Sequence, residues 1–140
     1  MMKHTLLAVF LFTSAALAAD VYTPTDAERA RWTMDDMMTW RTAIQAYATD
    51  HHEYPDVKTI EQLQAAVEPI YIIHAPLHDA WGHAYRYERL TPTTFRLVSA
   101  GVDGQFDESS WSTAAKKLSF DADAVVTSEG RWMFRSWEFK

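Results

Sequence analysis

The hydrophobic period of this chain changes once, and that change is the strongest constraint on its fold. In residues 25–50, apolar side chains recur at the spacing of one helix face, namely Ala30, Met34, Met37, Ile44, Tyr47 and Ala48. From residue 83 onward they alternate with polar side chains, as in half-buried strands. Helices followed by strands predict an α+β domain: a long N-terminal helix and a short helix packed on one face of a small antiparallel sheet.

Capping signals set the bounds of the two predicted helices. The sequence TDAE at residues 25–28 is a capping box, so the long helix begins there and runs to about Asp50. Pro55 then ends the helical pattern, because proline and the residue before it disfavour helical backbone. A second capping box, TIEQ at residues 59–62, opens a short helix that ends before Pro69.

Two hairpins are predicted in the second half of the chain. Tyr85 and Tyr87 share one side of a strand over residues 83–88, and the turn TPT at residues 91–93 leads to a partner strand containing Phe95 and Leu97. The second hairpin comprises residues 124–127, the turn SEG at residues 128–130, and residues 131–137.

The N-terminal residues have the pattern of a secretory signal peptide. An apolar run at residues 6–12 follows a basic start, and the small-x-small sequence ALA occupies residues 16–18. The run is shorter than the roughly 20 residues of a membrane span. We therefore expect residues 1–18 to be removed, leaving residues 19–140 as one periplasmic or secreted domain without a membrane span. A retained N-terminal anchor is the alternative.

Composition limits the partners and the sources of stability. The chain has 13 basic and 19 acidic residues, a net charge of −6, which becomes about −7 when Lys3 is removed with the signal peptide. Such an acidic domain repels phosphate backbones, so we expect no nucleic-acid partner. The chain has no cysteine, so an exported form has no disulfide and depends on its core or on a metal.

The acidic loop, residues 103–123, is the strongest candidate for a functional site. It contains five acidic residues, Asp103, Asp107, Glu108, Asp121 and Asp123. Loops longer than about 12–15 residues usually have a functional reason. Gathered carboxylates repel unless a cation joins them, and calcium accepts irregular sets of oxygen ligands. A solvated acidic loop is the alternative. The spacing is not that of an EF-hand, because no glutamate closes a 12-residue loop.

Three short sequences resemble the C-terminal domain of the type II secretion major pseudopilin, protein G. They are DAWGHAYRY at residues 79–87, SAGVDG at residues 99–104 and DAD at residues 121–123. The family has a DPWGNPY turn, an SLGADG sequence and an acidic loop closed by DAD. The resemblance covers residues 54–123. It implies a non-catalytic, pilin-like head domain, and partners in a secretion or pilus-like system.

The resemblance also implies calcium as a cofactor. Its ligands would be the side chains of Asp103, Asp121 and Asp123 and the main-chain carbonyl of Ala100. The loop here is longer than in the family and lacks its glycine-rich stretch. Pseudopilins also carry a prepilin leader and an apolar helix, whereas ADVY at residues 19–22 leads into a polar helix start. We therefore expect a head domain exported as a soluble protein.

A small secreted hydrolase or a zinc-binding protein is the alternative function. His74, His78 and His83 are spaced by four and five residues, but zinc needs three or four converging ligands. A hydrolase would pair a histidine with Asp79 or Asp103. The chain has no cysteine and no Gly-x-Ser-x-Gly sequence, so no nucleophile is evident. We predict no catalytic residues, and we expect Asp79 and Trp81 to have structural roles.

Overall fold

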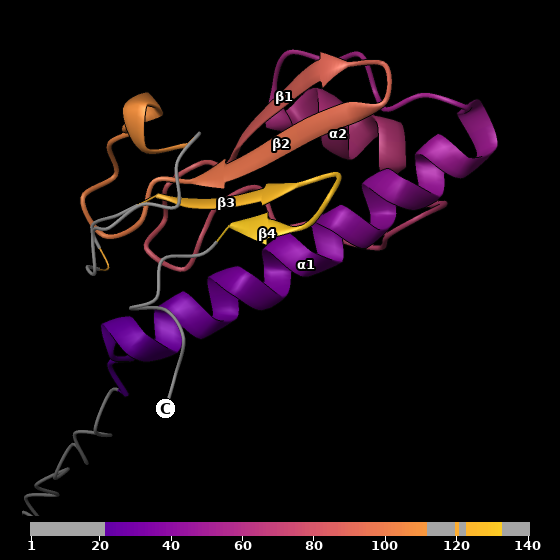
Figure 1. Cartoon of the computed structure of the whole chain (residues 1–140). Helices are drawn as coiled ribbons and strands as arrows, with labels where there is room; N and C mark the ends of the chain where they lie inside the picture. Colours follow the sequence, from indigo (N-terminus) through magenta and orange to yellow (C-terminus); the bar gives the residue numbers. More distant parts are fainter. Residues whose placement is uncertain (1–21, 112–119, 121–122, 133–140) are drawn as a thin grey trace, which may run out of the picture.

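The computed structural model describes residues 22–111, 120 and 123–132. The predicted signal peptide, residues 1–18, and the predicted ligand Asp121 lie outside these residues. The elements in chain order are α1 (Asp26–His51), α2 (Ile60–Val67), β1 (Arg86–Thr91), β2 (Thr94–Ser99), the 3₁₀-helix η1 (Glu108–Ser110), β3 (Ala124–Thr127) and β4 (Arg131–Trp132). Figure 1 shows α1 running along the sheet, with η1, in the described part of the acidic loop, at one end. The predicted α+β architecture is confirmed.

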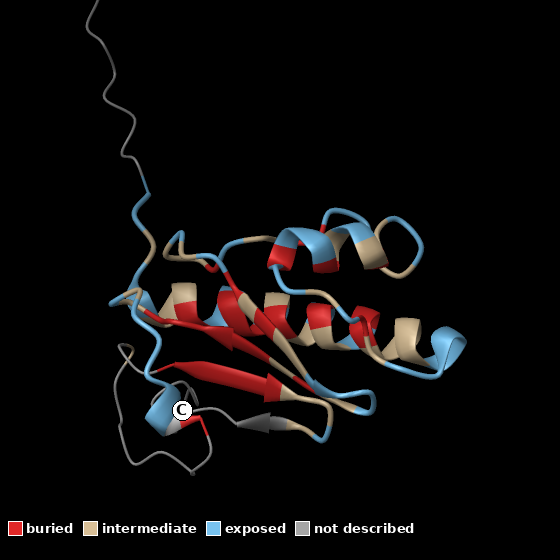
Figure 2. Ribbon diagram, turned by 90° about the horizontal axis from the view of Figure 1, so that it is seen from above, coloured by how far each residue is buried: buried red, intermediate tan, exposed pale blue. Residues whose placement is uncertain are grey.

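The capping box at the start of α1 is formed as predicted. The Glu28 N–H donates to Thr25 Oγ1 at 3.3 Å, and the Thr25 N–H donates to Glu28 Oε2 at 2.8 Å. The helix ends at His51, and its C-cap His52 has a φ of +63° and an N–H that donates to the Ala48 carbonyl. One face is buried: Ala30, Thr33, Met34, Met37, Trp40, Ala43 and Ile44. This face is red in Figure 2.

Helix α2 begins at its predicted position, but its second capping hydrogen bond differs from that of the predicted capping box. The Gln62 N–H donates to Thr59 Oγ1 at 3.2 Å, but Gln62 Oε1 accepts from the Lys58 N–H at 2.9 Å, one residue before the cap. The helix ends at Glu68, before Pro69. Its apolar side chains, Ile60, Leu63 and Val67, are all buried in the core.

The sheet is antiparallel and has the strand order β1-β2-β3-β4 among the described residues. Tyr87 pairs with Leu97, and Leu97 pairs with Val126, so these buried side chains form a row across the sheet. Helix α1 packs against β2 and β3, and α2 packs against β1. The second hairpin is confirmed as far as Trp132, and residues 133–137 of its predicted last strand lie outside the described residues.

A second, smaller core lies on the opposite face of the sheet. Successive strand residues point to opposite faces, so Val98 points away from the helices that cover Leu97. Val98 and its cross-strand partner Val125 are nevertheless buried, because Trp111 from the acidic loop packs against both. The acidic loop thus covers part of the sheet face that the helices leave open.

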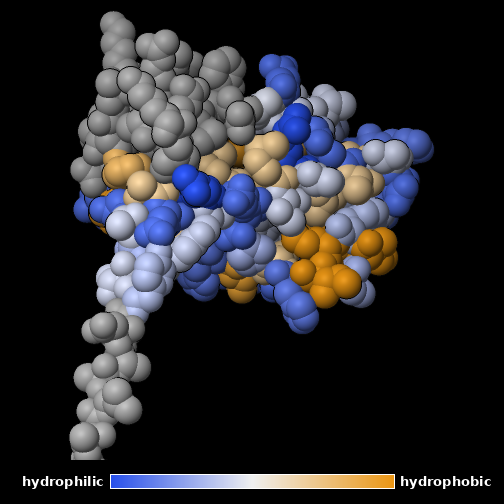
Figure 3. Space-filling view, turned by 90° about the horizontal axis from the view of Figure 1, so that it is seen from below, coloured by the Kyte–Doolittle hydropathy of each residue, from blue (hydrophilic) through white to orange (hydrophobic). Residues whose placement is uncertain are grey.

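The surface is mostly polar, with scattered apolar side chains. Ile70 and Ile73, which follow α2, are 77% and 73% exposed, and Figure 3 shows a cluster of hydrophobic atoms at one end of the molecule. Trp32 of α1 is 45% exposed. None of the helices in the described part of the chain is both long and apolar enough to cross a membrane.

Candidate metal centre in the acidic loop

The Trp-Gly turn, residues 79–83, is organised by one buried carboxylate. Asp79 Oδ1 accepts from the N–H groups of Trp81 at 3.0 Å and of His83 at 2.9 Å. Asp79 Oδ2 accepts from Ser99 Oγ at 2.7 Å. Gly82 has a φ of +89°, which glycine adopts without strain. Both oxygens of Asp79 are satisfied within the protein, so its structural role is confirmed.

Helix α1 anchors this turn. Trp81 Nε1 donates to Asp26 Oδ1 at 2.9 Å, and Arg29 donates to the Ala80 carbonyl at 2.8 Å. The structural role expected of Trp81 is therefore confirmed, although the side chain is only half-buried. The turn fixes the start of α1 against the sheet.

His83 connects the Trp-Gly turn to the acidic loop. Its Nδ1 lies 2.9 Å from the Gly101 carbonyl oxygen, which can only accept, so Nδ1 carries the proton of this bond. The ring also packs against Gly104, where a Cβ would lie 2.6 Å from His83 Nε2. Gly104 has a φ of +67°. Both the backbone and the packing therefore require glycine at this position.

Among the described residues, Asp123 is the one predicted side-chain ligand that is buried and only partly satisfied. It is 1% exposed, and its Oδ2 accepts from Trp111 Nε1 and from the Asp107 N–H at 2.8 Å. Among the described residues, Oδ1 has no hydrogen-bond partner. Burial raises the pKa of this carboxyl, and the carboxylates of Asp103 and Asp107 raise it further, against the two hydrogen bonds. A buried carboxylate oxygen without a partner costs free energy.

The other predicted ligands are described in part. Ala100 is fully buried directly after β2, and Asp103 is exposed, with Oδ1 accepting from the Gln105 N–H at 2.9 Å. Within the described ranges, no three His, Cys, Asp or Glu side chains are grouped so that they could hold a metal. The orphaned oxygen of Asp123 and the nearby carboxylates match the oxygen preference of a hard divalent cation.

Trp111 holds the acidic loop on the sheet. Its ring lies 4.5 Å from the guanidinium carbon of Arg96 and 5.1 Å from that of Arg86. Phe106 contacts it edge-on, with ring centroids 6.0 Å apart. An ion pair also holds the loop, with Arg86 Nη1 2.8 Å from Glu108 Oε1. Two aromatic residues within an acidic segment were the available signal for this packing.

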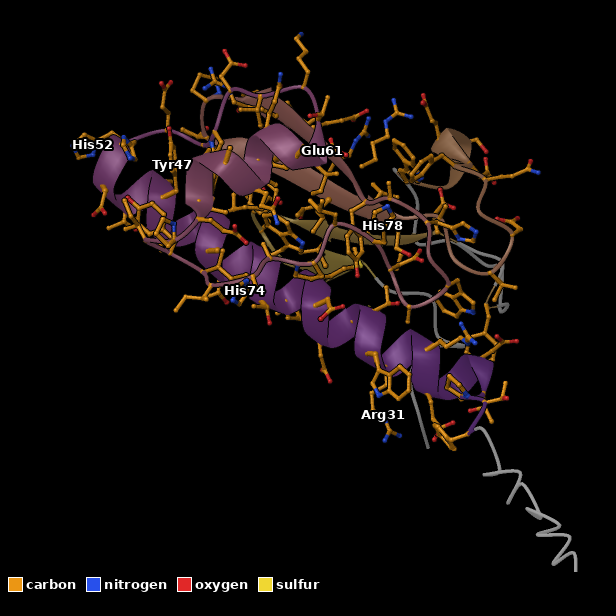
Figure 4. The ribbon with its side chains drawn as sticks, turned by 180° about the vertical axis from the view of Figure 1, so that it is seen from behind. Arg31, Tyr47, His52, Glu61, His74 and His78 are labelled. Atoms are coloured by element: carbon orange, nitrogen blue, oxygen red, sulfur yellow. The ribbon has the colours of Figure 1, made fainter. Side chains whose placement is uncertain are left out.

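The described histidines do not support the zinc alternative. His74 and His78 are exposed, and Figure 4 shows His52, His74 and His78 projecting from separate places on the molecule. His83 is engaged with Gly101, and no metal-binding group forms among the described residues.

Asp79, His83 and Ser99 do not form a nucleophilic triad. In such a triad the histidine lies between the serine and the aspartate. Here the Asp79 carboxylate lies between the other two, because Ser99 donates to Oδ2 while His83 Nδ1 lies 3.8 Å from Oδ1. Ser99 is also fully buried. This cluster therefore stabilises the turn and offers no activated hydroxyl.

Comparison with known proteins identifies the family. The family model described as type II secretion system (T2SS), protein G, matches residues 20–115. The chain belongs to this family. No curated protein and no solved structure matches it at a significant level. The protein G match contains α1, the Trp-Gly turn and the first part of the acidic loop, and it ends before Asp121 and Asp123. The resemblance to the major pseudopilin is thus confirmed, and the calcium ligands remain a prediction.

Proposed function

We propose that the protein is an exported, non-catalytic pseudopilin-like head in which calcium stabilises the acidic loop. Membership of the protein G family supports a role as a component of a type II secretion or pilus-like system. It also supports a location outside the cytoplasm, periplasmic or secreted. The partners would be other components of that system.

The observation that carries the calcium proposal is the free oxygen of Asp123. A carboxylate that is 1% exposed, with Oδ1 unpartnered among the described residues, is stabilised when a cation takes that oxygen. Asp103 and the Ala100 carbonyl would supply further oxygens, and Asp121, outside the described residues, would complete the carboxylate set. The bound ion would neutralise the repulsion between these groups and hold the loop.

Calcium would act on folding by mass action. The proposed ligands would be brought together in the folded loop and dispersed in the unfolded chain, so binding would favour the folded state. Extracellular calcium modules have Kd values of about 10⁻⁴ to 10⁻³ M. A calcium concentration tenfold above Kd stabilises by about 1.4 kcal/mol.

Thermal unfolding with calcium or EDTA tests this proposal. The wild type should melt at a higher temperature in calcium than in EDTA, whereas Asp123→Asn should melt at the same temperature in both. Asp35→Asn, which changes an exposed acid of α1, should respond to calcium as the wild type does. A wild type that does not respond, or an Asp123→Asn variant that responds fully, would contradict the proposal.

The proposed partnership has its own test. Site-specific photo-cross-linking at exposed Ile73, in cells with a type II secretion apparatus, should yield adducts with pseudopilus components. The same probe at exposed Glu61 is the matched control for non-specific capture. Equal adducts at both sites, or no pseudopilus adduct at any exposed position tried, would argue for a free-standing protein.

A further inference from the structure

We propose that Trp111 is a positioning residue for the calcium site, because its indole N–H orients the Asp123 carboxylate. This inference rests on the proposed calcium function. Trp111 Nε1 and the Asp107 N–H both donate to Asp123 Oδ2. The two bonds fix the carboxylate plane and leave Oδ1 without a partner among the described residues. Trp111 itself would not contact the ion.

Trp111 is suited to this role because its ring is held on several sides. It is 7% exposed and packs against Val98 and Val125 of the sheet. The guanidinium carbons of Arg96 and Arg86 lie 4.5 and 5.1 Å from the ring. These arginines belong to β2 and β1, so the position of the indole N–H is set by the sheet and not by the loop alone.

Hydrogen bonds that hold a metal-binding side chain in place raise the affinity of the site for the metal. A carboxylate that binds a metal is commonly fixed by hydrogen bonds to its other oxygen, and loss of such a bond typically weakens metal binding 10–100-fold. In this chain the Trp111 indole is fixed by its packing against Val98 and Val125 of the sheet. The sheet-anchored indole would therefore supply the preorganisation of Asp123.

Calcium affinity of Trp111→Phe tests the inference. Phenylalanine keeps an aromatic ring for the packing and removes the N–H donor. Isothermal titration with calcium alone, at a temperature where circular dichroism shows every variant folded, should give a Kd 10–100-fold higher than that of the wild type. Trp81→Phe is the matched control, because it removes the indole–carboxylate bond to Asp26 at the start of α1. Its Kd should stay within twofold of the wild type.

Equal calcium affinity of Trp111→Phe and the wild type would overturn the role of Trp111 and leave the calcium proposal standing. A wild type that binds no calcium would overturn both, so the two failures are distinguishable.

A second measurement uses only the wild-type protein. In the ¹⁵N spectrum of the wild type, the Trp111 indole N–H, assigned through contacts with the methyl groups of Val98 and Val125, should shift on calcium saturation. The indole of Trp40, which donates to the Pro76 carbonyl, should not. A Trp111 signal that does not move would overturn the inference.

Discussion

Two buried aspartates of this domain differ in how their oxygens are satisfied. Asp79 is 5% exposed and Asp123 is 1% exposed. Ser99 and two backbone N–H groups occupy both oxygens of Asp79. Among the described residues, Trp111 and Asp107 occupy one oxygen of Asp123 and leave the other without a partner. Burial alone therefore does not identify a ligand. The unpaired oxygen makes Asp123 the candidate ligand and Asp79 a determinant of the fold.

At the same scale, Asp36 predicts a pH dependence of stability. Burial raises the pKa of its carboxyl, and neighbouring Asp35 raises it further. The folded state then binds the proton more tightly than the unfolded state does. The contribution of Asp36 to stability therefore falls as the pH rises from 3.8, the pKa of this carboxyl in the unfolded chain, through its pKa in the folded protein. Asp36→Asn removes the titrating carboxyl.

We expect Asp36→Asn to gain stability relative to the wild type as pH rises from 3 to 7. Urea unfolding at several pH values measures the difference. A constant difference between Asp36→Asn and the wild type across this range would contradict the prediction.

At the scale of elements, local signals were sufficient for the helices and the strands but not for the outer face of the sheet. The capping sequences and the change of period depend on residues within four positions, so they predicted α1, α2 and the first hairpin. The burial of Val98 depends on Trp111, which follows it by 13 positions in an irregular segment. No periodic pattern records such a contact, so the sequence indicated Asp123 as a ligand but not the indole that holds it.

The capping box of α1 predicts a measurable cost for its loss. Thr25→Ala removes the acceptor of the Glu28 N–H, which should destabilise the protein by about 1 kcal/mol. Thr42→Ala is a matched substitution in the middle of the same helix, where the exposed hydroxyl bonds the Met38 carbonyl. It should have little effect, because alanine favours helix. Urea unfolding followed by circular dichroism gives both values, and equal stability of the two variants would contradict the prediction.

At the scale of the whole molecule, the sheet is covered from two sides by different means. Helices α1 and α2 bury one face through a continuous apolar core, and the acidic loop covers part of the other through Trp111. The Trp-Gly turn meets the loop through His83, near the candidate ligands. Contacts at the start of the acidic loop and at Trp111 thus connect it to the scaffold, so the proposed calcium binding should depend on the scaffold as well as on the carboxylates.

Gly104 tests this dependence. Alanine at this position would adopt a φ of +67° and place its Cβ 2.6 Å from His83 Nε2, so the ring must move and its bond to the Gly101 carbonyl must weaken. Gly82→Ala is the matched control. It has a φ of +89°, but nothing lies within 4 Å of its Cβ, so it carries only the backbone cost of about 1–2 kcal/mol.

Gly104→Ala should therefore unfold at lower urea than Gly82→Ala. It should also show a smaller rise in melting temperature on addition of calcium, because the displaced ring disturbs the segment between Ala100 and Asp103. Gly82→Ala should keep the full calcium response. Equal losses of stability in the two variants would show that the His83 contact contributes nothing, and a full calcium response in Gly104→Ala would show that the loop binds calcium independently of the turn.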